Sequence, residues 1–473
     1  MIPIARVIQD VPMLKIFSHY FPSHVLQQVV FDALVLFMAV IFAVAVQVRG
    51  GAVDWRVIVP SALLFAIAMI LLNSAMGLYR PAEGEWSTRT AIGRVLISIV
   101  VSIPVAFGVF LVLPWNYFAS EAMQISVMLL LGLVLLMRAV INRHWATSMF
   151  APRVLIIGTG ADAVTVERSL GSPRRSGMEV VGFYAVEGED SVDVDRGRVL
   201  DCKDLLQTVR QLRVNEVIVA VRERRGGVLP IRELLDCKVW GVRVLDLSSF
   251  FERVQGQVRI DSLKASWLIY GDGFRQGLAR AFVKRCFDLA ASSILLLAAL
   301  PVMAVTALLI ALEDGAPIFY RQERVGLGGR VFRVIKFRSM RRDAEKDGKP
   351  RWAVSGDDRV TRVGRVIRKL RIDELPQIFN VLKGEMSLVG PRPERPFFVD
   401  QLAQEIPFYA VRHCVKPGVT GWAQVRYQYG ASVDDAVQKL QYDLYYVKNH
   451  TIVLDTLVLF ETVRVVLTGE GAH

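Results

Sequence analysis

The sequence KRCFD (residues 284–288) leads into an apolar run, LAASSILLLAALPVMAVTALLIAL (residues 289–312). A helix of this length is long enough to cross a bilayer, which requires about 20 apolar residues. Pro301 lies near the middle and removes a backbone hydrogen bond, while the hydroxyls of Ser292 and Ser293 can bond to the freed backbone groups. We therefore expect a re-entrant helix, broken around Ser293 and Pro301, that enters and leaves the membrane by one face. The alternative is a kinked helix that crosses.

Basic residues dominate the chain after this run. The net charge is +12, and nearly all of the excess lies between Arg321 and Arg371. The alternating sequence FRVIKFRSM predicts a strand with Arg333 on one face and Lys336 and Arg338 on the other. A glycine-rich turn flanked by arginines precedes this strand and suits a polyanion. Arg321, Lys336 and Arg338 are therefore candidate phosphate-binding residues.

Two adjacent carboxylates follow a basic segment. The sequence TRVGRVIRKL (residues 361–370) predicts an amphipathic helix suited to an anionic membrane surface. In RIDELPQ, Pro376 favours the first turn of a new helix with Asp373 near its N-cap, where free N–H groups keep a carboxylate ionised and attract phosphate. Of Asp373 and Glu374, one can attack phosphorus while the other binds a divalent metal. The alternative is a purely structural helix cap.

Three more motifs lie farther along the chain. In SLVGPRPE, two prolines restrict the backbone around Arg392, which suits bidentate phosphate binding by its guanidinium. The sequence VKPGVTGWAQV (residues 415–425) predicts a rigid, turn-rich loop. YDLYYVKN (residues 442–449) supplies aromatic and polar groups. Each of the last two is also compatible with ordinary packing.

Together, FRSM, DELPQ, SLVGPRP, KPGVTG and YDLYYVKN, in this order after an apolar hairpin, resemble the bacterial polyprenyl-phosphate phosphoglycosyl transferases of the large monotopic class. The resemblance is specific from about Asp272 onward and weaker before it. It implies transfer of a sugar 1-phosphate from a UDP-sugar to undecaprenyl phosphate, at the inner face of the cytoplasmic membrane. This would be the first membrane step in making an exopolysaccharide, capsule or O-antigen.

The resemblance also implies roles for individual residues. Asp373 would attack the β-phosphate, release UMP and hold the phosphosugar covalently, and Glu374 would help to bind Mg²⁺. Arg392 matches the phosphate-binding arginine, and Pro301 matches the break in the re-entrant helix. The family often has Gly-Leu-Trp-Gln where this chain has Gly-Trp-Ala-Gln at residues 421–424, so we infer no sugar preference.

The N-terminal part of the chain contains four further apolar stretches of spanning length. They are Val29–Val48, Val57–Leu78, Val95–Leu113 and Ala122–Ile141. They predict a four-helix transmembrane bundle in residues 1–150, without a removed signal peptide because no small-residue cleavage site follows the first. The basic residues favour both ends of the bundle in the cytoplasm. We expect a multi-pass protein of the bacterial cytoplasmic (inner) membrane whose catalytic domain is cytoplasmic.

Strand-like and helix-like segments alternate in residues 151–262, which predicts a Rossmann-like α/β domain. Its first turn has the pattern G-x-G-x-x-A, with Gly158 and Gly160 as weak candidates for nucleotide binding. A non-binding structural or regulatory domain is the alternative. A linker (residues 263–283) then leads to the re-entrant helix and α/β monotopic catalytic domain (residues 284–473). The predicted fold is thus that of a multi-domain membrane protein.

The cysteines and the basic residues argue against several classes of protein. The four cysteines form no CxxC pair, which argues against a disulfide scaffold or a structural zinc site. Nucleic acid is not expected as a partner, because the basic residues adjoin a membrane-lying helix and no aromatic stacking platform is evident. Membrane lipid is expected, and a homodimer is consistent with the resemblance. Two other functions stay open: a glycosyl transferase that releases UDP, and a non-catalytic sensor that binds nucleotide and lipid.

Overall fold

The computed structural model divides the chain into two compact units, one formed mainly by residues up to Phe250 and the other mainly by residues from Phe251. The structure describes residues 13–16, 19–47, 55–75, 100, 103–104, 132, 152–171, 178–186, 192–200, 204–221, 229–260, 277–341, 359–427 and 432–468.

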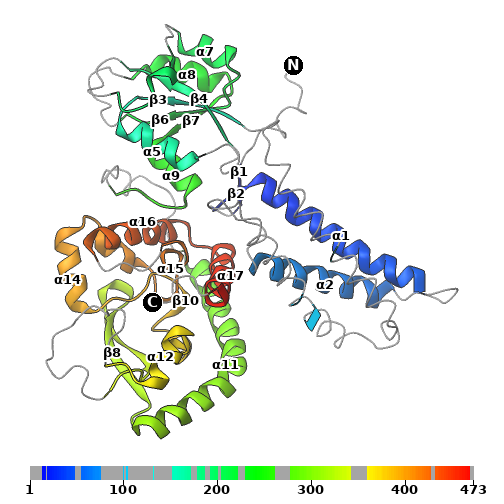
Figure 1. The fold of residues 1–473 in the computed structure, drawn as a ribbon, viewed down its shortest axis with the longest axis vertical. Helices are drawn as coiled ribbons and strands as arrows, with labels where there is room; N and C mark the ends of the chain where they lie inside the picture. The colour runs from blue at the N-terminus through cyan, green and yellow to red at the C-terminus, as the bar shows by residue number, and fades with distance from the viewer. Residues whose placement is uncertain are drawn as a thin grey trace. The chain divides into compact units, whose positions relative to one another are not determined.

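Two apolar helices, α1 (Ser23–Gln47) and α2 (Trp55–Ala75), pack against each other near the N-terminus (Figure 1). They follow a short pair of strands, β1 (Met13–Ile16) and β2 (His19–Pro22). The helices coincide with the first two predicted spans. The other two predicted spans lie almost entirely outside the described residues, so the four-helix bundle stays a prediction.

A parallel five-stranded sheet forms an α/β domain in the first unit, with strand order β5-β4-β3-β6-β7. Its strands are β3 (Arg153–Ile157), β4 (Glu179–Tyr184), β5 (Val199–Leu200), β6 (Glu216–Val219) and β7 (Arg243–Asp246). The remaining elements of this region are α5 (Ala161–Leu170), η3 (Arg196–Arg198), α7 (Leu205–Gln211), α8 (Ile231–Val239) and α9 (Leu247–Val254). Helices cover both faces of the sheet (Figure 1). The alternating buried side chains of β3 explain this arrangement, because Leu155 and Ile157 pack with α7 and α8 while Val154 and Ile156 face the other way.

The second unit carries most of the motifs. A long helix, α11 (Leu278–Asp314), is followed by an antiparallel hairpin, and a short parallel strand pair lies in the core. The hairpin is β8 (Phe319–Val325), η4 (Leu327–Gly329) and β9 (Val331–Phe337). The parallel pair is β10 (Ser387–Val389) and β11 (Gly418–Thr420). The other elements are α12 (Arg362–Lys369), η5 (Ile372–Glu374), α13 (Gln377–Lys383), α14 (Pro396–Glu405), η6 (Tyr409–Cys414), α15 (Trp422–Arg426), α16 (Val433–Asn449) and α17 (Ile452–Thr468).

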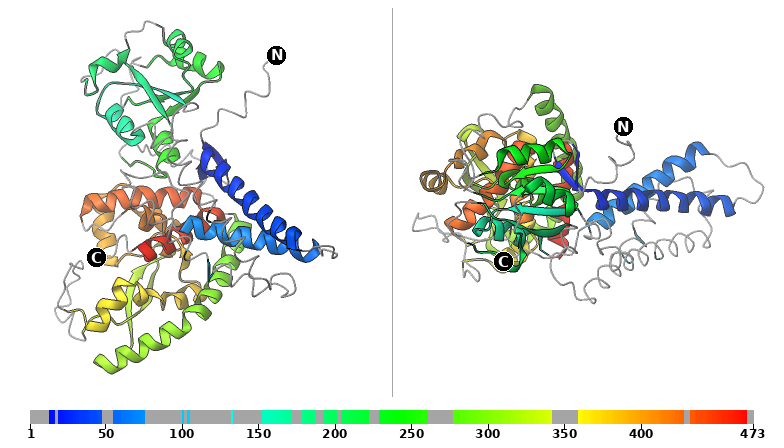
Figure 2. Two further views of the ribbon diagram at one scale, coloured as in Figure 1. Left: turned by 45° about the vertical axis from the view of Figure 1, so that its right-hand side comes forward. Right: turned by 90° about the horizontal axis from the view of Figure 1, so that it is seen from above.

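The helix α11 is uninterrupted from Leu278 to Asp314 with Pro301 inside it, so the break expected around Ser293 and Pro301 is not seen as a gap in the helix, and the re-entrant path through the membrane stays a prediction. The helix curves instead (Figures 1 and 2). A proline removes one amide donor and crowds one preceding carbonyl, which a helix can absorb by bending when its neighbours are packed. Such packing is present here, since Ala299 and Met303 on either side of Pro301 lie in a core cluster with Phe337 and Ile367.

The first turns of α11 are bound to the rest of the unit by polar side chains. Lys284 donates to Asp288 at 3.0 Å and pairs with Asp455 of α17 at 2.8 Å. Arg285 donates to the carbonyls of Val381 and Leu382 at the end of α13. The KRCFD segment therefore anchors the helix to the folded domain and sets the direction in which its apolar part leaves.

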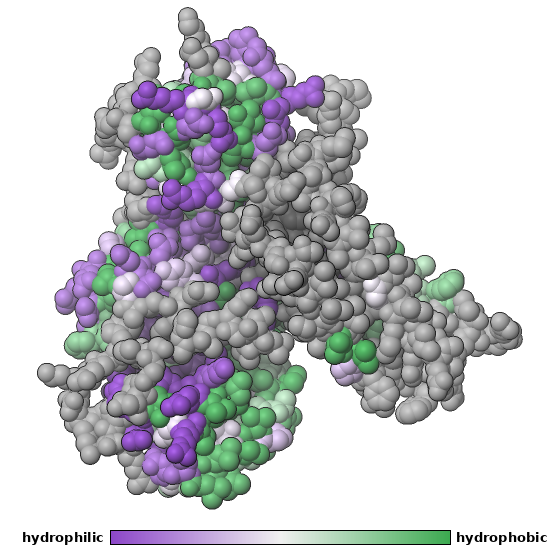
Figure 3. Space-filling view, viewed as in Figure 1, coloured by the Kyte–Doolittle hydropathy of each residue, from purple (hydrophilic) through white to green (hydrophobic). Residues whose placement is uncertain are grey.

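The outer face of α11 is apolar and exposed. Ile294, Leu297, Leu308 and Leu312 each have at least 60% of their surface exposed. An apolar surface runs along this part of the unit, beside a hydrophilic one (Figure 3). Among the described residues, α11 is the one helix long and apolar enough to cross a membrane, and shorter apolar stretches lie in α1 and α2. The exposed apolar side chains of α11 are suited to contact lipid.

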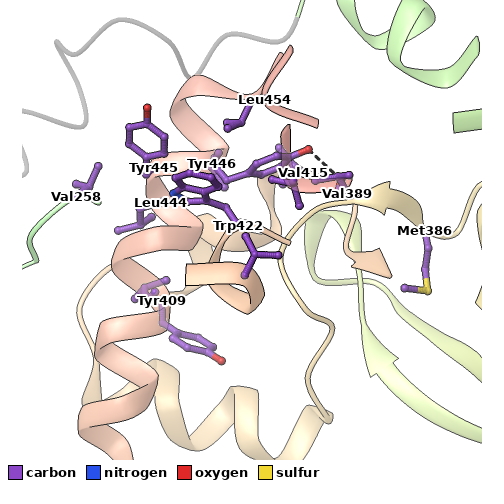
Figure 4. Packing of buried hydrophobic residues seen from close by; sticks show 14 of the residues in the cluster. Val258, Met386, Val389, Tyr409, Val415, Trp422, Leu444, Tyr445, Tyr446 and Leu454 are labelled. Atoms are coloured by element: carbon purple, nitrogen blue, oxygen red, sulfur yellow. Dashed lines mark hydrogen bonds between the residues drawn. The ribbon is translucent and has the colours of Figure 1, made fainter. Parts of the chain in front are cut away.

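Trp422, Tyr445 and Tyr446 form the centre of the core of this unit (Figure 4). The indole of Trp422 stacks on Tyr445 and donates to the carbonyl of Gly256 at 2.7 Å. Lys448 pairs with Glu252 at 2.8 Å. Residues 251–260 therefore pack with the C-terminal unit, which begins before the domain boundary predicted at residue 262. Trp422 itself is a core residue.

Candidate active site

The carboxylates Asp373 and Glu374 lie in the short 3₁₀ turn η5 between α12 and α13. Arg371 precedes this turn in the left-handed conformation, with φ 53°, and turns the chain sharply after α12. The next helix, α13, has Pro376 at its N-cap, so Asp373 lies near that N-cap but in a separate turn before it. The two carboxylates are thus presented by a tight turn and not by the start of a regular helix.

Glu374 lies at the centre of a cationic cluster. Its Oε1 accepts a hydrogen bond from Lys336 Nζ at 2.8 Å and one from Arg392 Nη2 at 2.7 Å. Burial favours the neutral form, but Arg392 and Lys336 outweigh it and hold the pKa of Glu374 well below its usual range. Glu374 is therefore ionised at neutral pH. The structure brings together three predicted site residues from β9, η5 and the loop after β10.

Asp373 has a different environment from its neighbour. Burial and the adjacent charge of Glu374 raise the pKa of Asp373 to about 6, against the opposing effect of Lys336, Arg368 and Arg392. Two adjacent carboxyl groups with pKa values moved apart are typical of a functional pair with separate roles. Asp373 is the less strongly paired of the two and is still mostly ionised at neutral pH.

Arg368 is a site residue that the sequence analysis did not assign. It lies near the end of α12, close enough to Asp373 to lower its pKa. The predicted amphipathic helix is confirmed, but its apolar residues divide into two groups. Val363 and Ile367 pack into the core with α11, whereas Val366 and Leu370 are more than half exposed. The exposed pair is available to a membrane surface.

Two predicted phosphate-binding residues lie elsewhere. Arg338 is buried and donates to the carbonyls of Asp314 and Gly315, at the end of α11. A cation at this position stabilises the helix C-terminus and is not available to substrate. Arg321 is exposed and pairs in register with Ile335, so it lies on the opposite face of the hairpin from Lys336. The structure brings neither arginine to Glu374.

The other predicted candidates lie in the α/β domain and on α11. Gly158 follows β3 with φ 115°, a conformation that favours glycine, and Gly160 is the N-cap of α5. The carbonyl of Thr159 between them accepts hydrogen bonds from the amides of Asp193 and Val194. Ser293 and Pro301 lie inside the continuous helix α11.

A metal ion at the carboxylate pair would have few ligands from the protein. No group of three or more His, Cys, Asp or Glu side chains suited to a metal is found within the described ranges. Mg²⁺ is usually held by one or two carboxylates, with its other oxygen ligands coming from water and substrate phosphates. The hydrogen bonds from Lys336 and Arg392 both engage Oε1 of Glu374, so the ionised carboxylate fits an ion that takes its remaining ligands from a bound diphosphate.

Comparison with known proteins finds relatives over the part of the chain that carries these residues. Residues 279–469 match the family model described as bacterial sugar transferase. The chain is 46% identical over 276 residues to the UDP-N-acetylgalactosamine-undecaprenyl-phosphate N-acetylgalactosaminephosphotransferase of Aeromonas hydrophila, covering 58% of this chain and 63% of that protein. It is 34% identical over 388 residues to the undecaprenyl-phosphate glucose phosphotransferase of Komagataeibacter xylinus, covering 76% of this chain and 70% of that protein.

One similarity extends over almost the whole chain. The UDP-glucose:undecaprenyl-phosphate glucose-1-phosphate transferase of Xanthomonas campestris pv. campestris is 30% identical over 465 residues, which cover 92% of this chain and 94% of that protein. The names of all three relatives contain undecaprenyl phosphate, whereas one names N-acetylgalactosamine as the sugar and two name glucose.

Proposed function

Because the chain belongs to the bacterial sugar transferase family, we propose that it transfers a sugar 1-phosphate from a UDP-sugar to undecaprenyl phosphate and releases UMP. The observation that carries this proposal is the pairing of Glu374 with Lys336 and Arg392 beside the less tightly held carboxylate of Asp373. A diphosphate needs positive charge around it, and a two-step transfer needs a nucleophile that is free to react.

In the first step, an oxygen of the Asp373 carboxylate attacks the β-phosphorus of the UDP-sugar. A new phosphorus–oxygen bond forms, and the bond from that phosphorus to the bridging oxygen of the diphosphate breaks. UMP leaves with the bonding electrons, and the sugar phosphate stays on Asp373 as an acyl phosphate. Lys336 and Arg392 are placed to stabilise the negative charge that develops on the phosphoryl oxygens and the leaving group.

In the second step, an oxygen of undecaprenyl phosphate attacks the same phosphorus and the bond to Asp373 breaks. The products are the lipid diphosphate sugar and the free carboxylate, so no proton is gained or lost overall. Mg²⁺ held by Glu374 and the substrate diphosphate would neutralise charge on that diphosphate. The exposed apolar faces of α11 and α12 would keep the site close to the lipid.

The finer topology is part of the same proposal. We infer a multi-pass protein of the bacterial cytoplasmic membrane with this site on the cytoplasmic face, where nucleotide sugars are made. The parallel strand order β5-β4-β3-β6-β7 supports a Rossmann-like classification of the α/β domain.

The nucleotide product tests the reaction class. Full-length protein in nanodiscs is incubated with Mg²⁺, undecaprenyl phosphate and a panel of UDP-sugars. We expect UMP, dependent on the lipid phosphate for continued turnover, with one or two donors. Release of UDP would instead indicate transfer of the sugar alone, and the absence of both nucleotides across the panel would contradict the proposal.

Replacement of Lys336 by methionine is expected to lower kcat/KM by about 10- to 100-fold. This factor corresponds to the free energy that a hydrogen bond to a charged group contributes. The change removes one of the two cations on Glu374, while Arg392 remains. Lys383→Met is the matched control, because Lys383 is exposed at the end of α13. Equal activities of the two variants would show that Lys336 has no part in the reaction.

A further inference from the structure

The loop Pro391-Arg392-Pro393-Glu394 is held by its carbonyl groups. Each of these four consecutive carbonyls accepts a hydrogen bond from a different donor. The donors are Gly418 N to Pro391 O at 2.9 Å, Arg412 Nη2 to Arg392 O at 2.9 Å, Arg324 Nη1 to Pro393 O at 3.0 Å and Val325 N to Glu394 O at 2.9 Å. Because the two prolines have no N–H group, these carbonyl acceptors contribute strongly to fixing the loop, together with the ion pair between Arg324 and the Glu394 side chain.

Arg412 differs from the other three donors because it is a buried charge. Its side chain is 6% exposed, and besides the Arg392 carbonyl it contacts Asp443 Oδ2 at 2.8 Å and the hydroxyl of Tyr409 at 2.6 Å. A buried ion pair is often no more stabilising than apolar side chains of the same size. Stability alone is therefore a weak explanation for this arginine.

The contacts of Arg412 lead directly to the candidate active site. Arg412 holds the main chain of Arg392, and the side chain of Arg392 donates to Glu374. Asp443 lies in the YDLYYVKN motif on α16, for which the reaction scheme has no other use. A guanidinium with a fixed fork of donors can bond a carboxylate and a carbonyl together, which orients both.

We propose that Arg412, itself oriented by Asp443, is a positioning residue that holds the Arg392 carbonyl so that the Arg392 guanidinium meets Glu374 and the substrate phosphate. The inference rests on the proposed transfer reaction for its kinetic consequence. Loss of Arg412 removes none of the side chains that would bind the phosphate. It does free the loop that orients one of them, Arg392. Small misplacements of a phosphate-binding group cost about 100-fold in rate.

A double-mutant cycle separates positioning from simple packing. Arg412→Met and Arg392→Met are made alone and together in the full-length protein, and kcat/KM is measured with the donor that gives UMP. If Arg412 acts through Arg392, Arg412→Met lowers kcat/KM by about 10- to 100-fold in the wild-type background but less than about 3-fold when Arg392 is already methionine. The same fold loss in both backgrounds would overturn the proposal.

Arg338→Met is the matched control. Arg338 is also buried and also holds two main-chain carbonyls and a carboxylate, but its partners are Asp314 and Gly315 at the end of α11. Arg338→Met should lower kcat/KM by the same factor with and without Arg392→Met, because Arg338 and Arg392 share no partner. If Arg412→Met does not fold, Asp443→Asn keeps the size of the side chain and is carried through the same cycle with the same expectation.

Amide hydrogen exchange gives a readout that does not need activity. Peptides covering residues 390–395 should exchange faster in Arg412→Met than in wild type, with little change in Arg338→Met. Unchanged exchange in Arg412→Met would overturn the positioning role even if activity falls. Faster exchange in a protein that makes neither UMP nor UDP would contradict the proposed reaction while supporting the hold of Arg412 on the loop.

Discussion

Asp373→Asn should abolish the covalent intermediate and lower turnover by about 10⁴- to 10⁶-fold, the range found when one residue of a catalytic triad is removed. The amide has nearly the same shape as the carboxylate but cannot attack phosphorus. Because Lys336 and Arg392 bond to Glu374, the cationic cluster should survive the change. The variant should therefore still bind the UDP-sugar.

Intact-protein mass spectrometry checks this result directly. Wild-type protein mixed with Mg²⁺ and UDP-sugar, without lipid phosphate, should gain the mass of one sugar phosphate, and Asp373→Asn should gain nothing. Asp400→Asn, an exposed change on α14, should keep the adduct. A sugar phosphate adduct on Asp373→Asn would show that the nucleophile is another residue. If the adduct were lost in Glu374→Gln but kept in Asp373→Asn, Glu374 would be the nucleophile.

The parts of the site that could be predicted from sequence are those set by local pattern. Alternation predicted a strand with Lys336 and Arg333 on opposite faces, and β9 is a strand over Val331–Phe337. Arg338 shares the parity of Lys336, but the strand ends at Phe337, so the alternation no longer determines where its side chain lies. Its partners at Asp314 and Gly315 are long-range contacts that no local pattern reveals.

Local sequence patterns also could not predict the geometry of the turn that carries Asp373 and Glu374. Proline in RIDELPQ correctly indicated a helix start nearby, but the left-handed conformation of Arg371 inserts a separate 3₁₀ turn before α13. Non-glycine residues rarely adopt this conformation, so propensity argues against it. The sequence predicts that Arg368 belongs to a basic helix. Only the structure shows that Arg368 lies close enough to Asp373 to lower its pKa.

Three glycines in the SLVGPRP and KPGVTG motifs allow two main-chain segments to approach more closely than any side chain would permit. A Cβ on Gly390 would lie 2.3 Å from the carbonyl oxygen of Lys416, one on Gly418 would lie 2.1 Å from Gly390 N, and one on Gly421 would lie 2.2 Å from Gly390 O. These neighbours are backbone atoms of the β10–β11 pair and its extensions, so they cannot turn aside as a flexible side chain can. The two motifs thus share one structural requirement.

Gly390→Ala should therefore destabilise the C-terminal unit by about 3 kcal/mol or more, the upper part of the range for overpacking. The added methyl group must separate the strands, which weakens the bonds from Gly390 N to Thr420 O and from Gly418 N to Pro391 O, both 2.9 Å. Since Pro391 begins the loop that carries Arg392, activity should be lost at temperatures where the fold survives.

Unfolding of the full-length variant in nanodiscs, followed by tryptophan fluorescence, measures the effect, because Trp422 lies in the core of the same unit. A loss of this size corresponds to a fall in Tm of about 6–12 °C for a domain of this length. Gly277→Ala is the control: nothing lies within 4 Å of its added Cβ, and its φ of −71° suits alanine. Its cost should stay below about 1 kcal/mol, that of a lost N-cap preference. A Gly390→Ala protein as stable as Gly277→Ala would mean that the close approach of the two segments is not required for the fold.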